Sequence, residues 1–419
     1  MKNLALCVPT YKRADIIERF LNSEIDIINN YDIDLYIFDS SDDDFTQKIV
    51  AKYSNSTKIN YIRMDSHLSS AEKVFLIYQQ FEESDYEYIW MTHDHTEIKE
   101  EAFQLILDSL NQKADFYVIN LHSSKSSSQI ILDMDEFMVK NAWILNRFGT
   151  AIISITKVIK GTNWRYINGK YLRKKVMNYA HVGYYLERIS QINNPRCVLL
   201  CVPHEFFYDY TRCEKRSWDY DTMRITTECW GSIILSQSSK YSRKAKKITL
   251  RSPGKTEITQ YKLIKMRKEK NYNLIVCLRY VKWLFRMFHI RDTFIFLLIS
   301  ILPYRISEFI YNIKIKNIVK REYKKGNKVV IYGAGKFAVE CAEKFIKANV
   351  DYDGFIVKTM KDNPDILCKH KVYVAEDYMI NNNCFIIIAV SRHGMDEVKE
   401  FLGNIKTKKN IKFIESGDF

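Results

Sequence analysis

Hydrophobic residues in the first 120 positions form short apolar runs that alternate with helically spaced stretches. Leu4–Pro9 and Tyr86–Met91 have the length of buried strands, whereas apolar side chains in Ser70–Phe81 recur at three- and four-residue intervals. Further strands are expected at Leu35–Phe38, Ile59–Met64 and Phe116–Asn120, and further helices at Asp15–Leu21, Thr46–Tyr53 and Glu100–Leu110. Strands that alternate with helices predict an α/β fold with a mostly parallel sheet.

The pattern changes twice further along the chain. Residues 240–325 are basic, aromatic and largely helical, and they include the continuous apolar run Phe294–Leu302. From Lys328–Tyr332 onward, strand and helix signals alternate again. We therefore expect three parts, namely an α/β domain over residues 1–240, a basic amphipathic helical segment over 241–326 and a small α/β domain over 327–419.

Composition narrows the class of protein. Hydrophobic residues make up 47% of the 419 positions, which excludes a disordered chain. The nine cysteines are irregularly spaced with no CxxC pair, so a reducing cytosol fits better than a disulfide framework or a zinc site. Scarce Gly and Pro and abundant Lys, Ile and Asn are typical of a bacterial protein from an AT-rich genome. The apolar N-terminus, interrupted at Pro9, predicts a buried strand and not a signal peptide.

Positive charge is concentrated in the middle of the chain. Residues 240–330 contain 24 Lys and Arg but five Asp and Glu, a local net charge of +19 within a total of +14. Such a block indicates an anionic partner. Because no nucleic-acid-binding module is recognisable, nucleic acid is not an expected partner. Two alternatives stay open for this segment: a helix pair at the surface of an anionic membrane, or a helical hairpin packed on the protein with a solvated basic face.

Polar residues cluster where the first, second and fourth expected strands end. These turns read Val8–Arg13, Phe38–Asp44 and Tyr88–His95. In open α/β sheets the ligand lies beyond the carboxyl ends of the strands. The three turns therefore predict a binding site at one edge of the sheet.

This ordered set of turns resembles family 2 glycosyltransferases of the GT-A fold. The family opens with a strand and a Pro-Thr/Ser-Tyr/Phe-Asn/Lys-Arg turn, continues with a strand that ends in Asp, and has a DxD-type metal motif after its fourth strand. The resemblance covers roughly the first 100 residues well and the next 140 loosely. It implies transfer of a sugar from a UDP-sugar or another nucleotide-sugar donor.

The resemblance also implies roles for individual residues. Asp39 would contact the base or ribose, and Ser69 and Lys73 would lie near the donor, although the family often has Asn-x-Gly-x-Ala there. The residues expected to bind the nucleotide-sugar are Pro9, Thr10, Tyr11, Arg13, Asp39, Ser69, Lys73, His93 and Asp94.

The expected metal motif is atypical. Where the family has DxD or DDD, this chain has His93-Asp94-His95. Asp94 and His95 are the expected ligands of a divalent ion, Mn²⁺ or Mg²⁺, and imidazole shifts the preference away from Mg²⁺. One alternative is a metal-independent site in which the histidines contact the diphosphate directly.

Inverting transfer requires a base that deprotonates the acceptor hydroxyl. The family supplies an Asp or Glu from the second half of the domain. Glu187 and Asp209 are the expected candidates, with Glu205 and Asp133 as further ones. A purely structural role is an open alternative for each of them.

The C-terminal region contains a second candidate site. Gly333, Gly335 and Ala338 follow a strand and begin a helix, which resembles a Rossmann dinucleotide fingerprint. Asp351 or Asp353 would then contact the ribose. A scaffold that retains the turn without a cofactor is the alternative.

Together these features predict a cytoplasmic glycosyltransferase, peripheral on the inner face of the cell membrane. Its acceptor would be a glycan or a polyprenyl-diphosphate-linked sugar in the synthesis of a bacterial capsule, lipopolysaccharide or related surface polysaccharide. Two alternatives are a membrane-attached nucleotide-binding scaffold or sensor without transferase activity, and a nucleotidyltransferase. The latter would need a Gly-rich first loop, which Val8–Arg13 does not have.

Overall fold

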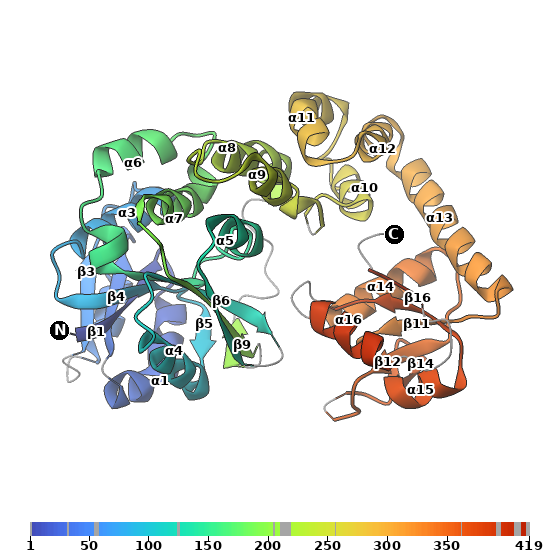
Figure 1. Ribbon diagram of the computed structural model, residues 1–419, viewed down its shortest axis with the longest axis horizontal. Coiled ribbons are helices and arrows are strands. Elements are labelled where there is room, and N and C mark those ends of the chain that lie inside the picture. The colour runs from blue at the N-terminus through green and yellow to red at the C-terminus, as the bar shows by residue number, and fades with distance from the viewer. Residues whose placement is uncertain are drawn as a thin grey trace. The chain divides into compact units, whose positions relative to one another are not determined.

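The computed structural model divides into two compact units, unit 1 (Met1–Ser252) and unit 2 (Pro253–Phe419) (Figure 1). The structure describes residues 2–31, 33–53, 58–123, 126–203, 206–209, 219–255, 257–361, 363–390, 395–405 and 412–415. The finer division of the chain at residues 240 and 326 remains a prediction.

Unit 1 contains an eight-stranded sheet, in the order β3-β2-β1-β4-β8-β6-β9-β7 among the described residues. Its strands are β1 (Lys2–Thr10), β2 (Ile33–Asp39), β3 (Ile59–Arg63), β4 (Tyr86–Met91), β6 (Phe116–Ser123), β7 (Ser127–Ile131), β8 (Ala151–Ser154) and β9 (Cys197–Pro203). Strands β3, β2, β1 and β4 are parallel, whereas β8 is antiparallel to both β4 and β6. The predicted α/β class is confirmed, and β1 and β4 flank the point where the strand order reverses.

Helices cover both faces of this sheet. They are α1 (Ala14–Asn30), α2 (Phe45–Ala51), α3 (Ser70–Gln80), α4 (Glu100–Leu110), α5 (Met134–Asn141), α6 (Trp164–Tyr171), α7 (Ala180–Gln191), α8 (Trp230–Leu235) and α9 (Arg243–Leu250). Short 3-10 or π-helical segments lie at Ile155–Ile159, Met177–Tyr179, Asp219–Asp221, Arg224–Cys229 and Ser252–Lys255. A separate two-stranded sheet pairs β5 (Thr96–Ile98) with β10 (Phe207–Asp209).

Alternating side chains of β6 show how the two faces are filled. The ring of Tyr117 meets Tyr88 of β4 at 5.5 Å, within the cluster that includes residues of α1 and α4. The ring of Phe116 points to the other face and meets Phe137 of α5 at 5.7 Å and Tyr185 of α7 at 5.3 Å. This period of two is what a sheet buried on both sides requires.

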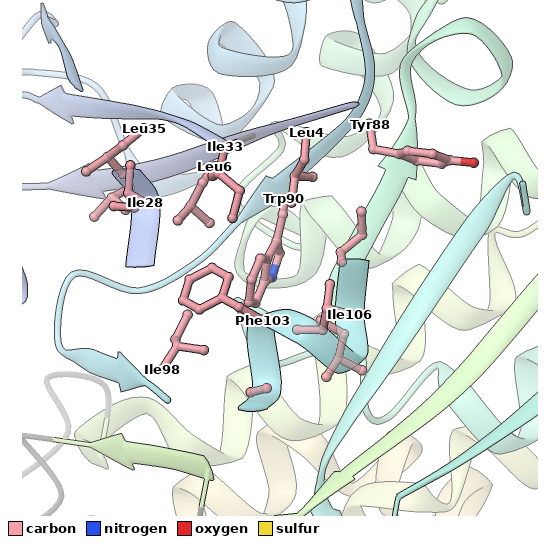
Figure 2. Packing of buried hydrophobic residues seen from close by; sticks show 14 of the residues in the cluster. Leu4, Leu6, Ile28, Ile33, Leu35, Tyr88, Trp90, Ile98, Phe103 and Ile106 are labelled. Atoms are coloured by element: carbon pink, nitrogen blue, oxygen red, sulfur yellow. The ribbon is translucent and has the colours of Figure 1, made fainter. Parts of the chain in front are cut away.

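The core under α1 and α4 anchors the central strands (Figure 2). Trp90 of β4 is fully buried, and its ring meets Phe103 of α4 at 5.8 Å. Its indole nitrogen donates to the carbonyl of Gly149 at 2.9 Å. A buried Trp stabilises such a core by about 3–5 kcal/mol relative to Ala. The carboxyl end of β4 is therefore held on a rigid element.

Helix α3 begins where its sequence predicts. Ser69 is the N-cap, and its hydroxyl oxygen accepts from the backbone nitrogen of Glu72 at 3.3 Å. The carboxylate of Glu72 accepts in turn from the backbone nitrogen of Ser69 at 2.8 Å. This capping box fixes the first turn of the helix, which also carries Lys73.

Unit 2 joins a helical segment to a second sheet. Its helices are α10 (Gln260–Lys268), α11 (Leu274–Met287), α12 (Ile290–Ile301), α13 (Tyr304–Lys324), α14 (Lys336–Lys347), α15 (Ala375–Asn381) and α16 (Met395–Asn404). Pro303 separates α12 from α13, because proline is tolerated at a helix start but not in its interior. In the described parts of the chain, no helix has both the length and the hydrophobicity that a bilayer crossing requires.

The sheet of unit 2 has the order β13-β14-β12-β11-β15-β16 among the residues described. Its strands are β11 (Lys328–Tyr332), β12 (Gly354–Val357), β13 (Ile366–Leu367), β14 (His370–Val374), β15 (Cys384–Ile388) and β16 (Lys412–Glu415). All neighbours are parallel except β13 and β14. This order is compatible with the expected Rossmann-like domain.

Candidate active site

The candidate active site lies at the switch point between β1 and β4. Thr10 is the last residue of β1, and Asp94 follows β4 by three positions. The Thr10 hydroxyl donates to Asp94 Oδ2 at 2.9 Å, although the two residues are 84 positions apart. The parallel pairing of the two strands thus brings together two turns that the sequence only places in order.

Asp94 is buried and fully engaged. Its side chain is 6% exposed, and Oδ1 accepts from Arg13 Nη1 at 3.0 Å and pairs with His95 Nδ1 at 2.9 Å. Burial alone would raise the pKa of Asp94, but the hydrogen bond from His95, the charge of Arg13 and the bond from Thr10 outweigh it and lower the pKa. The carboxylate is therefore charged at neutral pH.

Lys73 supplies a second cation from α3. Its Nζ donates to the carbonyl oxygen of Thr10 at 3.0 Å and lies 6.0 Å from the centre of the Tyr11 ring. The residue is 8% exposed, and burial lowers its pKa against the opposing charges of Asp39 and Asp94. The capping box at Ser69 fixes the helix start that positions this ammonium group.

Asp39 ends β2 and is fully buried. Its Oδ1 accepts from the Ser41 hydroxyl at 2.5 Å and from the Ser41 backbone nitrogen at 2.8 Å. Its Oδ2 accepts from the Tyr61 hydroxyl at 2.9 Å and lies 3.6 Å from Arg63 Nη1. The two hydrogen bonds from Ser41 are local to the turn after β2. They are the bonds expected if Asp39 has a structural role in that turn.

Ser41, Tyr61 and Arg63 were missed by the sequence analysis. Tyr61 and Arg63 belong to β3, and the register of β2 and β3 places Arg63 beside Asp39. A polar residue at the end of the third strand was a signal that could have identified Arg63. An open hollow beside it is lined by Arg63, Met64, Asp65 and Leu68 and by residues of α3.

The two histidines of the motif lie against different partners. The rings of His93 and His95 are 4.5 Å apart, and His93 also meets Phe148 edge-on at 6.0 Å. Phe148 stacks on His181 at 4.6 Å. His181 is buried with Nε2 at 3.1 Å from the Leu145 carbonyl, and burial lowers its pKa to about 4, so it is neutral. His181 supports the site through packing.

The residues present fit a divalent ion only in part. Asp94 and His95 are adjacent and supply carboxylate and imidazole donors, which suit Mn²⁺ better than Mg²⁺. Within the described ranges, no group of three or more His, Cys, Asp or Glu side chains is placed to hold a metal. Asp94 Oδ1 is also engaged by Arg13. An ion here would need further ligands from diphosphate or water.

The two candidate bases lie in different surroundings. Glu187 of α7 pairs with Lys170 Nζ at 2.5 Å and accepts from the Tyr171 hydroxyl at 3.0 Å, among the helices of unit 1. Asp209 ends β10, and the strand register places its backbone opposite Thr96, one residue after His95. Pairing with β5 therefore brings the backbone of Asp209 to the candidate site. Glu205 lies outside the described residues, and Asp133 caps α5.

The glycine turn of unit 2 follows β11. Gly333 has φ +114°, and a Cβ there would lie 3.0 Å from the Ala389 carbonyl oxygen. Gly335 is the N-cap of α14, and a Cβ there would meet nothing within 4 Å. The expected ribose contact at Asp353 is wrong, because Asp353 precedes β12 and pairs with Lys328 at the start of β11. It thus lies at the amino ends of the strands, whereas ribose binds at the carboxyl ends.

The α/β fold brings a polar cluster to the carboxyl ends of β1, β2 and β4, where ligands bind in open α/β sheets. Residues 5–172 match the family model described as glycosyl transferase family 2. This part of the chain is similar to the GT-A glycosyltransferase domains of that family, and the match makes the protein a glycosyltransferase. The resemblance inferred from the three strand-end turns is confirmed. None of the curated proteins matches the chain.

Several solved structures are similar to this chain at low identity. S. aureus TarS 1-349 is 11% identical, with 78% of this chain and 92% of that chain covered and a TM-score of 0.43. The same TarS fragment in complex with UDP-GlcNAc is 11% identical, with 78% and 93% covered and a TM-score of 0.42. Mannosyltransferase PcManGT from Pyrobaculum calidifontis in complex with GDP-Man and Mn²⁺ is 9% identical, with 71% and 85% covered and a TM-score of 0.36. Similarity at this level fixes neither donor nor acceptor for this chain.

Proposed function

We propose that this glycosyltransferase moves a sugar from a nucleotide-sugar donor with inversion, at the site formed by the ends of β1 and β4. The observation that carries the proposal is buried, charged Asp94, held by Thr10, Arg13 and His95 at the switch point of the sheet. A carboxylate at this position would hold the donor's anionic diphosphate through a cation, either a divalent ion or Arg13.

The donor would lie along the edge defined by β1 and β2. Arg13 and Lys73 are the cations that would neutralise the diphosphate leaving group. The Tyr11 side chain is about half exposed and can stack on a ring, while Asp39 would accept hydrogen bonds from base or ribose. Pro9 and Ser69 shape the turns from which these groups project, and His93 would contact the diphosphate.

Asp94 and His95 are the residues that would hold a divalent ion. Such an ion would supply Lewis-acid neutralisation of the leaving diphosphate. Arg13 would then release Asp94 Oδ1 and donate to a phosphate oxygen of the donor instead. Between the two candidate bases we favour Asp209 over Glu187, because the β5–β10 pairing places its backbone beside the motif and Glu187 is already ion-paired.

The acceptor we propose is a glycan or polyprenyl-diphosphate-linked sugar in bacterial surface polysaccharide synthesis, at the cytoplasmic face of the membrane. The support is the strongly basic stretch that follows the catalytic domain, with 24 Lys and Arg in residues 240–330. A cationic surface suits an acceptor carried on an anionic lipid.

A donor panel tests the proposal. Purified protein is incubated with UDP-, GDP- and CDP-sugars, with Mn²⁺ or with EDTA, and release of the nucleoside diphosphate is measured. We expect turnover of one donor class, and Asp94→Asn should lower kcat/KM by at least about 100-fold. The matched control is Asp42→Asn, because Asp42 is exposed and pairs with the exposed Lys12 ammonium.

Full activity of Asp94→Asn would refute the site assignment. Full activity in EDTA would refute the metal but leave Arg13 and Lys73 as the neutralising groups. Turnover of none of the sugars, with measurable UDP or GDP binding, would argue for the nucleotide-binding scaffold instead.

A further inference from the structure

Helix α12 has an unusual distribution of polar residues. Its exposed residues include Ile290, Phe294, Leu298 and Ile301, each more than half exposed, beside Arg291. Its buried face combines Thr293 and Ser300 with Phe296 and Ile299. A solvated surface helix would expose mainly polar residues. The outer face of α12 is therefore built to contact something other than water.

Exposed apolar side chains continue on α13. Ile306, Phe309 and Ile310 are exposed at helical spacing, with Phe309 at 64% exposed. Ser307, between them, is buried. One stripe of α13 is thus apolar near the end that adjoins α12. Lys320 is also exposed and lies nearer the C-terminal end of α13. The exposed residues of α13 thus change from apolar to basic toward that end.

Helix α11 joins this apolar surface. The rings of Phe285 and Phe294 meet edge to face at 6.2 Å, although both side chains are about half exposed. The exposed faces of α11 and α12 are therefore contiguous. We use the term apolar helical surface for Phe285, Phe294, Leu298, Ile301, Phe309 and Ile310. Contiguous exposed apolar side chains on this scale mark an interaction site.

Positive charge borders the apolar helical surface. Arg279, Lys282 and Arg286 of α11 are exposed, and α11 contains no acidic residue. From residue 271 to 324 the chain has ten Lys and Arg against three Asp and Glu. One of the three acids, Glu322, is buried and paired with Lys325 at 2.8 Å. The outward charge of this region is thus strongly positive.

Apolar side chains bordered by cations match one kind of partner closely. An anionic bilayer offers acyl chains to the Phe, Leu and Ile side chains and negative headgroups to the Lys and Arg side chains. A second copy of this chain would bring the same positive charge to the interface, which disfavours self-association. Nucleic acid would use the cations but would leave the aliphatic side chains in water.

We propose that the apolar helical surface of α11, α12 and α13 binds in the plane of an anionic lipid bilayer. The twelve residues of α12 span about 18 Å, shorter than the roughly 30 Å hydrocarbon core, so the helix lies in the interface. Phe294, Leu298 and Ile301 enter the acyl boundary. Arg279, Lys282 and Arg286 contact the headgroups. This binding does not depend on sugar transfer.

Vesicle flotation of the full-length protein tests the proposal. Vesicles of phosphatidylcholine alone are compared with vesicles that contain phosphatidylglycerol. We expect binding to the anionic vesicles that weakens with salt, and Arg279→Gln with Lys282→Gln should reduce the partition coefficient by about 30-fold. Phe294→Gln with Leu298→Gln should reduce it at least about tenfold. Ile346→Gln is the matched control, because Ile346 of α14 is 61% exposed but lies outside the surface.

Thermal unfolding and UDP binding of each variant show that the protein remains folded and that the donor site is intact. The charge variant keeps every apolar side chain, so it tests the proposal even if the apolar variant folds poorly. Equal binding to both kinds of vesicle, or variants that bind like Ile346→Gln, would overturn the proposal. So would a change of oligomeric state in the apolar variant without vesicle binding, which would assign the surface to contacts between copies. Because flotation is read without a sugar donor, its failure is distinct from failure of the transferase assay.

Discussion

In both units a turn follows a strand that pairs with parallel neighbours on both sides, β1 in unit 1 and β11 in unit 2. The two turns carry different kinds of residue. In unit 1 the turn after β1 carries charged side chains, and Arg13 reaches Asp94 at 3.0 Å. In unit 2 the turn after β11 carries Gly333 and Gly335, and a Cβ at Gly333 would meet the Ala389 carbonyl oxygen and the Val390 side chain. The turn of unit 1 therefore offers charged side chains, whereas the glycines of unit 2 leave backbone amides uncovered.

The helices that follow these two turns begin in the same way, without a side-chain cap, and α1 has Arg13 at its N-cap. Helix α3, which carries Lys73 but follows β3, starts instead with the reciprocal capping box of Ser69 and Glu72. Helix α14 starts at Gly335 with no side-chain hydrogen bond to its first turn. A helix start without a cap leaves backbone amides available to an anion, whereas a capped one positions side chains. The turns after β1 and β11 therefore differ in the side chains that they carry and not in the capping of the helices that follow them.

Among the variants that test this comparison of the two units, the largest effect is expected from Lys73→Met. Methionine keeps most of the packing volume but removes the buried ammonium group beside Thr10. We expect UDP- or GDP-sugar binding to weaken by about 10- to 100-fold, as loss of a charged hydrogen-bond donor predicts. Isothermal titration calorimetry measures the change. Lys48→Met is the control, because Lys48 is exposed and pairs with Asp44. Equal affinity of both variants would show that unit 1 does not use this cation.

A smaller effect is expected from Gly333→Ala. Alanine at φ +114° is strained, and its Cβ would press on the Ala389 carbonyl oxygen, so unit 2 should lose about 1–3 kcal/mol of unfolding free energy. Gly335→Ala is the matched variant, because its Cβ meets nothing within 4 Å and its stability should hardly change. Urea unfolding compares the two. If Gly335→Ala alone abolishes binding of a dinucleotide, the turn is a ligand site; similar destabilisation by both would contradict the strain argument.

The smallest effect is expected from Ser69→Ala. Loss of the N-cap should cost about 1 kcal/mol of stability and reduce donor affinity only slightly, because Lys73 keeps its place in the second half of the first turn. Thermal unfolding and donor titration measure the two quantities. Thr259→Ala removes the corresponding cap of α10 in unit 2 and should change stability without changing donor affinity. A large loss of donor affinity in Ser69→Ala would instead give its hydroxyl a direct contact.

Local patterns predicted the elements of the fold well. The helically spaced apolar residues between Ser70 and Phe81 correspond to α3, and the apolar run at Tyr86–Met91 is β4. The antiparallel insertion of β8 between β4 and β6 was not predicted, because strand direction depends on distant pairing. Helix α13 lies within residues 240–325, which were expected to be largely helical, but its bounds were not predicted, since its apolar stripe gives way to basic residues near Lys320.

The site was predicted by position and not by contacts. The ends of β1, β2 and β4 correctly marked Thr10, Asp39 and Asp94 as neighbours of one sheet edge. The bond between Arg13 and Asp94 and the contact of Arg63 with Asp39 depend on register and rotamer, which no spacing rule supplies. Asp353 was misplaced because a count of residues after the glycine turn does not say at which end of a strand a residue lies.

The pairing of β5 with β10 gives the site a folding order. Thr96 and Asp209 are 113 residues apart in sequence, and closing a loop of that length is entropically costlier than forming the neighbouring β1–β2 unit. The ends of β1 and β2, which carry Thr10 and Asp39, can therefore form before the β5–β10 pair closes. The family match itself ends at residue 172, before β10. If Asp209 is the base proposed above, sugar transfer would require the β5–β10 pair, whereas nucleotide binding would not.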